Sequence, residues 1–98
     1  MTRRVVFTPA AQTEAITAQE WYEGEAPGLG ARFRGEVDFV AQRLSADPLQ
    51  FPVVLADVRR ARLRKFPYGL FFRIVDETVF VIACFHSRRD PRQWQQRV

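Results

Sequence analysis

The chain has 98 residues, of which 47% are hydrophobic and 27% are charged, and its formal net charge is +4. This length predicts one domain over residues 1–98, with enough buried surface for a single core. The longest apolar run, Val79–Phe85, is far shorter than the roughly 20 residues that a membrane-spanning helix needs, which argues against a membrane protein. The single cysteine excludes an internal disulfide, so we expect a cytoplasmic protein.

The positive charge is concentrated near the C-terminus. Residues 59–98 contain ten Lys or Arg and three acidic residues, a net charge of +7, whereas residues 1–58 contain five and eight, a net charge of −3. This asymmetry predicts a polyanionic or acidic partner for the C-terminal part of the chain.

The first half is predicted to form one strand and two helices. Arg4–Phe7 is a short run with β-branched residues, which favours a strand. Thr8-Pro9 is a typical helix start, and small residues then repeat with helical spacing over residues 9–23. A stronger apolar stripe predicts a second helix over residues 29–45. The short connection between them indicates a helical hairpin.

The second half is predicted to form a three-stranded antiparallel meander over residues 60–64, 70–75 and 78–85. The apolar connector Leu49–Val58 is expected to pack partly on the core, and the polar tail 88–98 to end in a short helix. The predicted fold is therefore α+β, in the order β-α-α-β-β-β, with the helical hairpin packed on a twisted antiparallel sheet.

Three arginines alternate strictly along the first strand of the meander. This pattern places Arg60, Arg62 and Arg64 on one face, about 6.6–6.8 Å apart, which roughly matches successive phosphates of an extended nucleic acid. The planar guanidinium also binds phosphate in a bidentate manner. The alternative is a solvated strand face, which is less favourable with three like charges and no acid between them. We therefore predict that this face binds nucleic acid or another target.

The segment after the last strand holds the other candidates. His86, the only histidine, lies at the strand end and could serve as a general acid or base, or simply be a hydrogen-bonded strand-end residue. Arg88 and Arg89 follow, and an arginine combined with the indole of Trp94 suits single-stranded RNA. Alternatively, Trp94 anchors the tail on the sheet.

Other residues are expected to be structural. Trp21 and Tyr22 lie late in the first predicted helix and Cys84 lies in the apolar strand, and all three are assigned to the core. With one histidine and one cysteine, a metal site is not expected. The sequence contains no glycine-rich phosphate loop and no nucleophile elbow, so no cofactor is predicted.

Four motifs together carry a resemblance to a known family. They are F-T-P-A-A at 7–11, G-L-G-A-R-F at 28–33, R-x-R-L-R-x-F-P-Y-G at 60–69, and V-x-V-I-A-C-F-H-S-R-R-D-P-x-x-W at 79–94. In this combination, over nearly the whole chain, the sequence resembles the RelE/ParE superfamily of bacterial type II toxin–antitoxin modules. The resemblance implies the α+β fold described above and a toxin that a cognate antitoxin holds inactive.

The superfamily contains two kinds of toxin. RelE-like members cut mRNA inside the translating ribosome, whereas ParE-like members lack the nuclease residues and poison DNA gyrase. The resemblance places two RelE lysines at Arg60 and Arg62, and a later RelE arginine at Arg88 or Arg89. His86 could take the part of a histidine that other nuclease members carry at the end of the last strand, although ParE members can carry a Phe-His pair there.

Two departures favour the ParE-like interpretation. A RelE arginine is replaced by Gly69, and a late tyrosine falls near Trp94, which cannot donate a phenolic proton. Arginine stays protonated, so a nuclease would depend on His86, with Arg62 and Arg88 stabilising charge. We therefore predict a ParE-like gyrase poison. The alternatives are a RelE-like ribosome-dependent mRNA endonuclease and a non-toxic basic nucleic-acid-binding module, so enzyme activity stays open.

Overall fold

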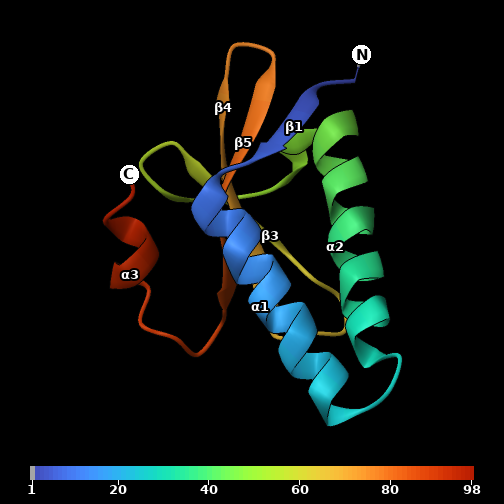
Figure 1. Ribbon diagram of the computed structural model, residues 1–98. Coiled ribbons are helices and arrows are strands. Elements are labelled where there is room, and N and C mark those ends of the chain that lie inside the picture. The colour runs from blue at the N-terminus through green and yellow to red at the C-terminus, as the bar shows by residue number, and fades with distance from the viewer. Residues whose placement is uncertain (1) are drawn as a thin grey trace.

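The computed structural model describes residues 2–98. The elements, in chain order, are β1 (Arg4–Phe7), α1 (Pro9–Glu25), α2 (Leu29–Ala46), the 3₁₀ turn η1 (Pro48–Gln50), β2 (Val53–Leu55), β3 (Val58–Arg62), β4 (Tyr68–Val75), β5 (Thr78–His86) and α3 (Arg92–Gln95). The predicted order, the helical hairpin and the C-terminal helix are confirmed (Figure 1). The predicted connector contains a 3₁₀ turn and an additional strand, β2.

The helical hairpin is shaped by local signals. The Thr8 side chain accepts a hydrogen bond from the Ala11 amide at 3.3 Å and caps α1. At the start of α2, Gly28 has a φ of +87°, in the left-handed region that favours glycine. The carboxylate of Glu23 accepts hydrogen bonds from the amides of Gly28 and Gly30, each at 3.0 Å. These hydrogen bonds link the last turns of α1 to the start of α2.

The strands form one mixed sheet in the order β1-β5-β4-β3-β2. The meander β3-β4-β5 is antiparallel, as predicted, and β2 extends it with another antiparallel pair. β1 instead pairs parallel with β5, so the sheet is not antiparallel throughout. The sequence indicated that β1 is a strand, but its partner lies more than 70 residues later and leaves no local signal.

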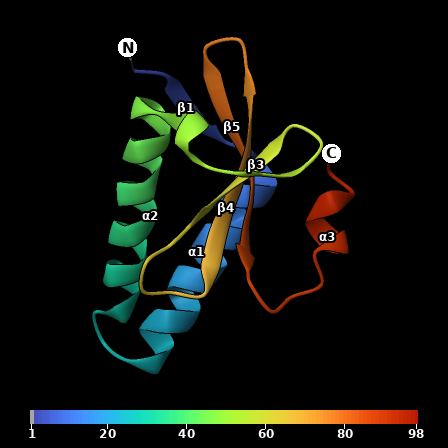
Figure 2. The ribbon, with the colours of Figure 1, turned by 180° about the vertical axis from the view of Figure 1, so that it is seen from behind.

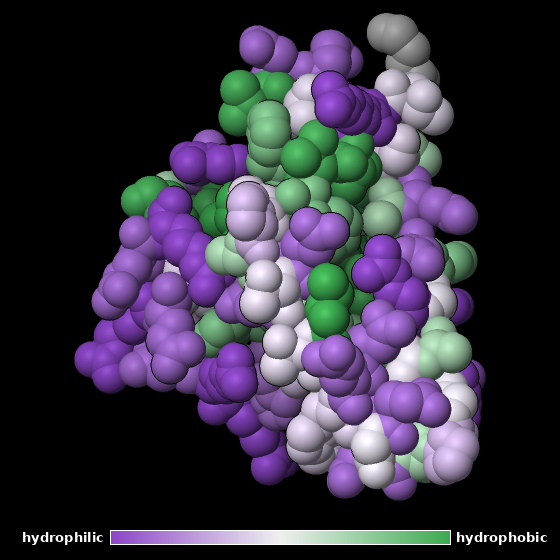
Figure 3. Space-filling view, viewed as in Figure 1, coloured by the Kyte–Doolittle hydropathy of each residue, from purple (hydrophilic) through white to green (hydrophobic). Residues whose placement is uncertain are grey.

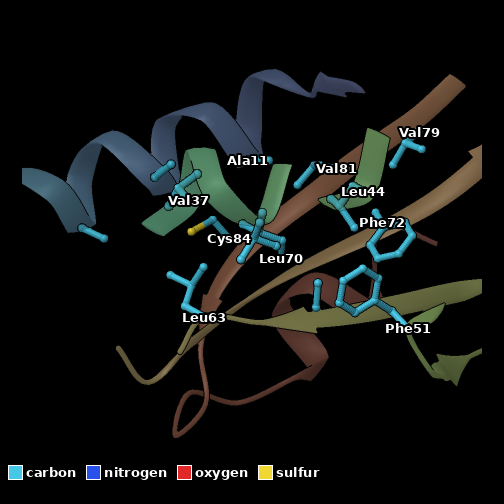
Figure 4. Close-up of a cluster of buried hydrophobic side chains, with 14 of the residues drawn as sticks. Ala11, Val37, Leu44, Phe51, Leu63, Leu70, Phe72, Val79, Val81 and Cys84 are labelled. Carbon is cyan, nitrogen blue, oxygen red and sulfur yellow. The ribbon is translucent and has the colours of Figure 1, made fainter. Parts of the chain in front are cut away.

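The helices and the sheet enclose the main hydrophobic core. Figure 4 shows side chains of the two helices pointing toward those of β4 and β5. The buried members of this cluster are Ala11, Ala15, Ala18, Phe33, Val37, Val40, Leu44, Phe51, Ala61, Leu63, Leu70, Phe72, Val79, Val81 and Cys84. No helix among residues 2–98 combines the length and apolar character needed to cross a bilayer.

A smaller core lies on the opposite face of the sheet, where α3 packs. Its buried members are Val58, Phe71, Ile82, Ala83, Phe85 and Trp94. Figure 2 shows this side, with the strands in front of the hairpin and α3 beside them. A register shift between Phe71 and Phe72 makes Ile82 an extra residue in β5, and Ile82 and Ala83 both join this smaller core.

Candidate functional site

A cleft of about 490 Å³ opens at the end of the sheet, between β3–β4 and the segment leading to α3. We call this hollow the basic cleft, and its polar lining includes Arg60, Arg62, His86, Ser87, Arg89 and Gln95. Its other walls are mainly apolar and aromatic and come from both cores. Phe71, Phe85 and Trp94 belong to the smaller core, and Leu63, Phe66 and Tyr68 belong to or pack on the main core. Among the described residues that line it there is no carboxylate.

The predicted arginine ladder is divided. Arg60 and Arg62 lie on β3 and line the basic cleft. Arg64 lies beyond the end of β3, and its Nε donates to Glu36 Oε1 on α2 at 2.8 Å. Its guanidinium also lies 4.1 Å from the centre of the Phe39 ring. The prediction of three arginines on one strand face is therefore wrong for Arg64, because the strand ends two residues earlier and a helix supplies a carboxylate.

The pairing of Arg64 has an electrostatic consequence. Glu36 is only 8% exposed, and the hydrogen bond from the Arg64 side chain lowers the pKa of its carboxyl group, against the smaller opposing effect of desolvation. The Arg64 amide also donates to Glu36, at 3.1 Å. Arg64 thus stabilises the junction of the hairpin and the sheet. This pair leaves no local signal in the sequence, because its members are 28 residues apart.

Gly69 has a steric role at the cleft. It lies opposite Arg62 in the β3–β4 pairing, and a Cβ at this position would lie 3.3 Å from Cγ of Arg60. This distance is tighter than an ordinary van der Waals contact, so the glycine leaves room for the aliphatic part of Arg60 to lie over β4. Gly69, which stands where the resemblance expects an arginine, therefore makes room for the side chain of Arg60.

His86 is held at the mouth of the cleft. Its ring meets Tyr68 edge to face, with 5.1 Å between the ring centres. Its Nδ1 accepts a hydrogen bond from the Arg88 amide at 3.0 Å, which places the proton of the neutral ring on Nε2. Burial raises the pKa of the Tyr68 hydroxyl, which therefore stays protonated near neutral pH.

The two candidate arginines after β5 differ in position. Arg89 lines the cleft, and its guanidinium lies 5.7 Å from the centre of the Phe85 ring. Arg88 is exposed and does not line the cleft; its amide, rather than its side chain, contacts His86. Of the two, the structure brings Arg89 together with Arg60 and Arg62.

Trp94 is a structural anchor. It is 3% exposed, and its ring stacks on Phe71 with 4.3 Å between centres and an interplanar angle of 28°. A nucleic acid base would have to displace Phe71 to stack on that face of the indole. The structure therefore agrees with the second interpretation of Trp94, in which it holds the tail on the sheet.

A second hollow adjoins the basic cleft, between α1 and the end of β5, with a volume of about 630 Å³. We call it the α1–β5 groove; Trp21 forms one wall, and Pro67, Tyr68, His86 and Arg89 line both the groove and the cleft. Trp21 is 58% exposed, so its assignment to the core is wrong. Trp21 lies ten and three residues after the buried alanines Ala11 and Ala18, and this spacing did not show whether its side chain faces the core or the solvent. Tyr22 packs on the main core, as expected.

In the described part of the chain, neither the Cys84 thiol nor a metal site adds a reactive group. Burial raises the pKa of the Cys84 thiol to about 12, so the reactive thiolate is disfavoured. Within residues 2–98, His, Cys, Asp and Glu side chains do not form a group of three that could hold a metal ion. The chemistry available in the cleft is therefore that of fixed cations, one imidazole, one phenol and the Ser87 hydroxyl.

Known proteins share both the sequence pattern and the fold. Residues 5–91 match the family model of the ParE toxin of the type II toxin-antitoxin system, parDE. Toxin ParE2 of Mycobacterium tuberculosis is 27% identical over 92 residues, which cover 93% of this chain and 88% of that protein.

Two solved structures are similar to this one. The chromosomal ParDE toxin–antitoxin system from P. aeruginosa gives a TM-score of 0.77 at 15% identity, covering 87% of this chain and 96% of the other. The toxin–antitoxin complex RelBE2 from Mycobacterium tuberculosis gives a TM-score of 0.60 at 25% identity, covering 88% and 99%. The first likeness concerns the fold alone. Together they confirm the predicted fold class.

Proposed function

The chain belongs to the ParE toxin family of type II toxin–antitoxin systems, and from this membership we propose that it arrests growth by poisoning DNA gyrase through its basic cleft. It is a type II toxin, and its partner is a cognate antitoxin. The choice of gyrase as target, and the assignment of Arg60, Arg62 and Arg89 as target-binding residues, are the proposal.

The observation that carries this proposal is the chemistry of the basic cleft. Arg60, Arg62 and Arg89 are permanent cations, which bind and orient an anionic surface but cannot accept a proton. Among the described residues of the lining, His86 is the only imidazole, and there is no carboxylate that could serve as a base instead. Cleavage of RNA through its 2′-hydroxyl needs a free base, and the lone pair of His86 Nδ1 already accepts from the Arg88 amide, so the cleft is better suited to binding than to cleavage.

A specific contact supports the alternative, a ribosome-dependent mRNA endonuclease. His86 and Tyr68 are in ring contact beside Arg62 and Arg89. In this alternative the Arg88 amide must release Nδ1 of His86, which then takes the 2′-hydroxyl proton as the 2′-oxygen attacks the adjacent phosphorus. The P–O5′ bond breaks as the protonated Tyr68 hydroxyl donates to the leaving 5′-oxygen, and the arginines stabilise the phosphate. Arg88, the other arginine that the resemblance suggested, would act only through its amide contact with His86.

The substitution His86→Ala separates the two mechanisms. A gyrase poison should retain most of its ability to arrest growth, and the purified wild-type toxin should inhibit supercoiling by gyrase. An endonuclease should lose growth arrest entirely, since the cleft offers no other base. Primer extension on translated mRNA measures the second activity directly. Codon-phased cuts that appear with the wild type and vanish with His86→Ala would reject the gyrase proposal.

We also propose that residues 1–98 act as one toxin domain in the cytoplasm. Support comes from the main core, which joins α1 near the N-terminus to β5 near the C-terminus. Arg97, the penultimate residue, is further bound to Glu14 of α1 at 2.8 Å. A chain tied together at both ends is expected to unfold in one cooperative step.

A further inference from the structure

We propose that the α1–β5 groove is the docking pocket for the antitoxin, and that it takes an apolar side chain flanked by a carboxylate. This inference rests on the proposed function, since it presumes that the antitoxin is the partner. Beyond the identity of the partner, the proposal specifies where on the toxin the antitoxin binds and which kinds of antitoxin side chain the groove accepts.

The groove is open and apolar along α1. Thr13, Thr17 and Trp21 follow one another at intervals of four residues, which places them on one side of the helix, and all three are exposed. The threonines are small and Ala18 lies buried beside them, so the helix forms a shallow channel that ends at the indole. Figure 3 shows that the surface over α3, and over the segment that leads to α3, is mostly hydrophilic.

The floor of the groove is a connected series of aromatic rings. Trp21 meets Tyr22 edge to face at 5.0 Å, Tyr22 meets Tyr68 at 6.1 Å, and Tyr68 meets His86 at 5.1 Å, each measured between ring centres. Tyr22 is also stacked on the fully buried Phe33, with 5.2 Å between centres. A preformed aromatic surface of this kind binds an apolar side chain without a cost of ordering the pocket.

The charges of the groove select an acidic partner. Its one lining carboxylate, Glu14, is already engaged: it accepts from Arg97 at 2.8 and 3.0 Å and from the Cys84 amide at 3.1 Å. Arg89 has no carboxylate partner within residues 2–98, and with His86 it forms the rim at the end of β5. The uncompensated charge is therefore positive, and a carboxylate on the partner complements it.

The groove is continuous with the basic cleft, which gives docking a direct consequence. Tyr68, His86 and Arg89 line both hollows. A carboxylate bound to Arg89 from the groove removes that cation from the cleft, and the chain that carries the carboxylate covers the mouth where His86 lies. One anchoring event thus binds the antitoxin and blocks the toxic surface.

The test measures binding of the full toxin chain to its cognate antitoxin, by titration calorimetry. Trp21→Ala should raise the dissociation constant roughly tenfold or more, as expected for an aromatic hot spot. Ile16→Ala is the matched control, because Ile16 is an exposed apolar residue of the same helix outside the groove, and it should leave binding unchanged. Equal binding by wild type and Trp21→Ala would overturn the proposal.

A second pair of variants tests the charge and does not depend on Trp21. Thr17→Glu and Thr17→Gln place side chains of nearly equal size in the groove, and only the first carries a negative charge. Thr17→Glu should bind the antitoxin several-fold more weakly than Thr17→Gln, and the difference should shrink as salt is added. If the two bind equally at low salt, the groove does not recognise an acidic partner.

Other occupants give distinct outcomes. If Trp21→Ala weakens binding of a single-stranded oligonucleotide and leaves antitoxin binding intact, the groove is a nucleic-acid site and the proposal fails. If Trp21→Ala abolishes a concentration-dependent dimer seen by light scattering and leaves antitoxin binding intact, the occupant is a second copy of the chain. Growth arrest by the wild-type toxin alone tests the proposed function separately, since it requires no antitoxin.

Discussion

Arg64, beside the helical hairpin, differs from Arg60 and Arg62, on the side of α3, in having a carboxylate that compensates its charge. On the side of the helical hairpin, Arg64 makes two side-chain hydrogen bonds to Glu36 and lies on an aromatic ring. On the side of α3, Arg60 and Arg62 have no carboxylate partner within residues 2–98. The first arrangement stabilises the fold. In the second arrangement Arg60 and Arg62 repel each other unless an external anion binds between them. We therefore assign function to the side of α3.

The largest expected effect comes from reversing the uncompensated pair. Arg60→Glu combined with Arg62→Glu should abolish growth arrest and leave the melting temperature nearly unchanged, because both side chains reach the surface and have no partner to lose. The matched control is Arg4→Glu with Arg32→Glu, which changes the net charge equally at two exposed positions away from the cleft. Equal loss of toxicity in both double variants would show that only net charge matters.

The second prediction concerns the small core that supports the cleft. Trp94→Ala should lower the free energy of unfolding by about 3 kcal/mol, because it removes a buried ring stacked on Phe71. Gln93→Ala, an exposed neighbour in the same helix, should change it by less than about 0.5 kcal/mol. Urea denaturation of both variants gives the comparison. A small effect of Trp94→Ala would mean that α3 detaches easily and that the cleft loses one wall in solution.

The contrast between the two sides was only partly predictable from the sequence. Helical periodicity and strand alternation are local signals, and they correctly placed α1, α2 and the meander. The pairing of Arg64 with Glu36 was not predictable, because it depends on how the hairpin lies on the sheet. β2 was missed for a similar reason: its three residues form a strand only through pairing with β3.

The candidate site was predicted in composition rather than in arrangement. The sequence placed Arg60, Arg62, His86 and Arg89 among the functional residues, and these line one cleft. It did not predict the groove, because Trp21 follows helical spacing whether it faces the core or the solvent. Contacts with elements far away in the sequence decide which face of a helix is buried. A single sequence does not show these contacts directly.

The smallest expected effect is a pH dependence of stability on the side of the hairpin. Hydrogen bonds from Arg64 hold the pKa of Glu36 below its ordinary value of 4.5 in the folded protein. A carboxyl group whose pKa is lower in the folded than in the unfolded state contributes stability above its unfolded pKa. That contribution is lost as the pH falls below about 4.5 and through the folded pKa.

Glu36→Gln tests this dependence, because the amide keeps the size and an acceptor oxygen but cannot titrate. The variant should melt at a lower temperature than the wild type at pH 7, and the gap should narrow toward pH 3, where the wild-type carboxylate is protonated. Asp38→Asn is the control: this residue forms an exposed pair with Arg34 at 3.2 Å, and such pairs contribute little. If the difference in melting temperature between wild type and Glu36→Gln stays constant from pH 7 to pH 3, it reflects packing. The structural role of Arg64 would then not depend on its charge.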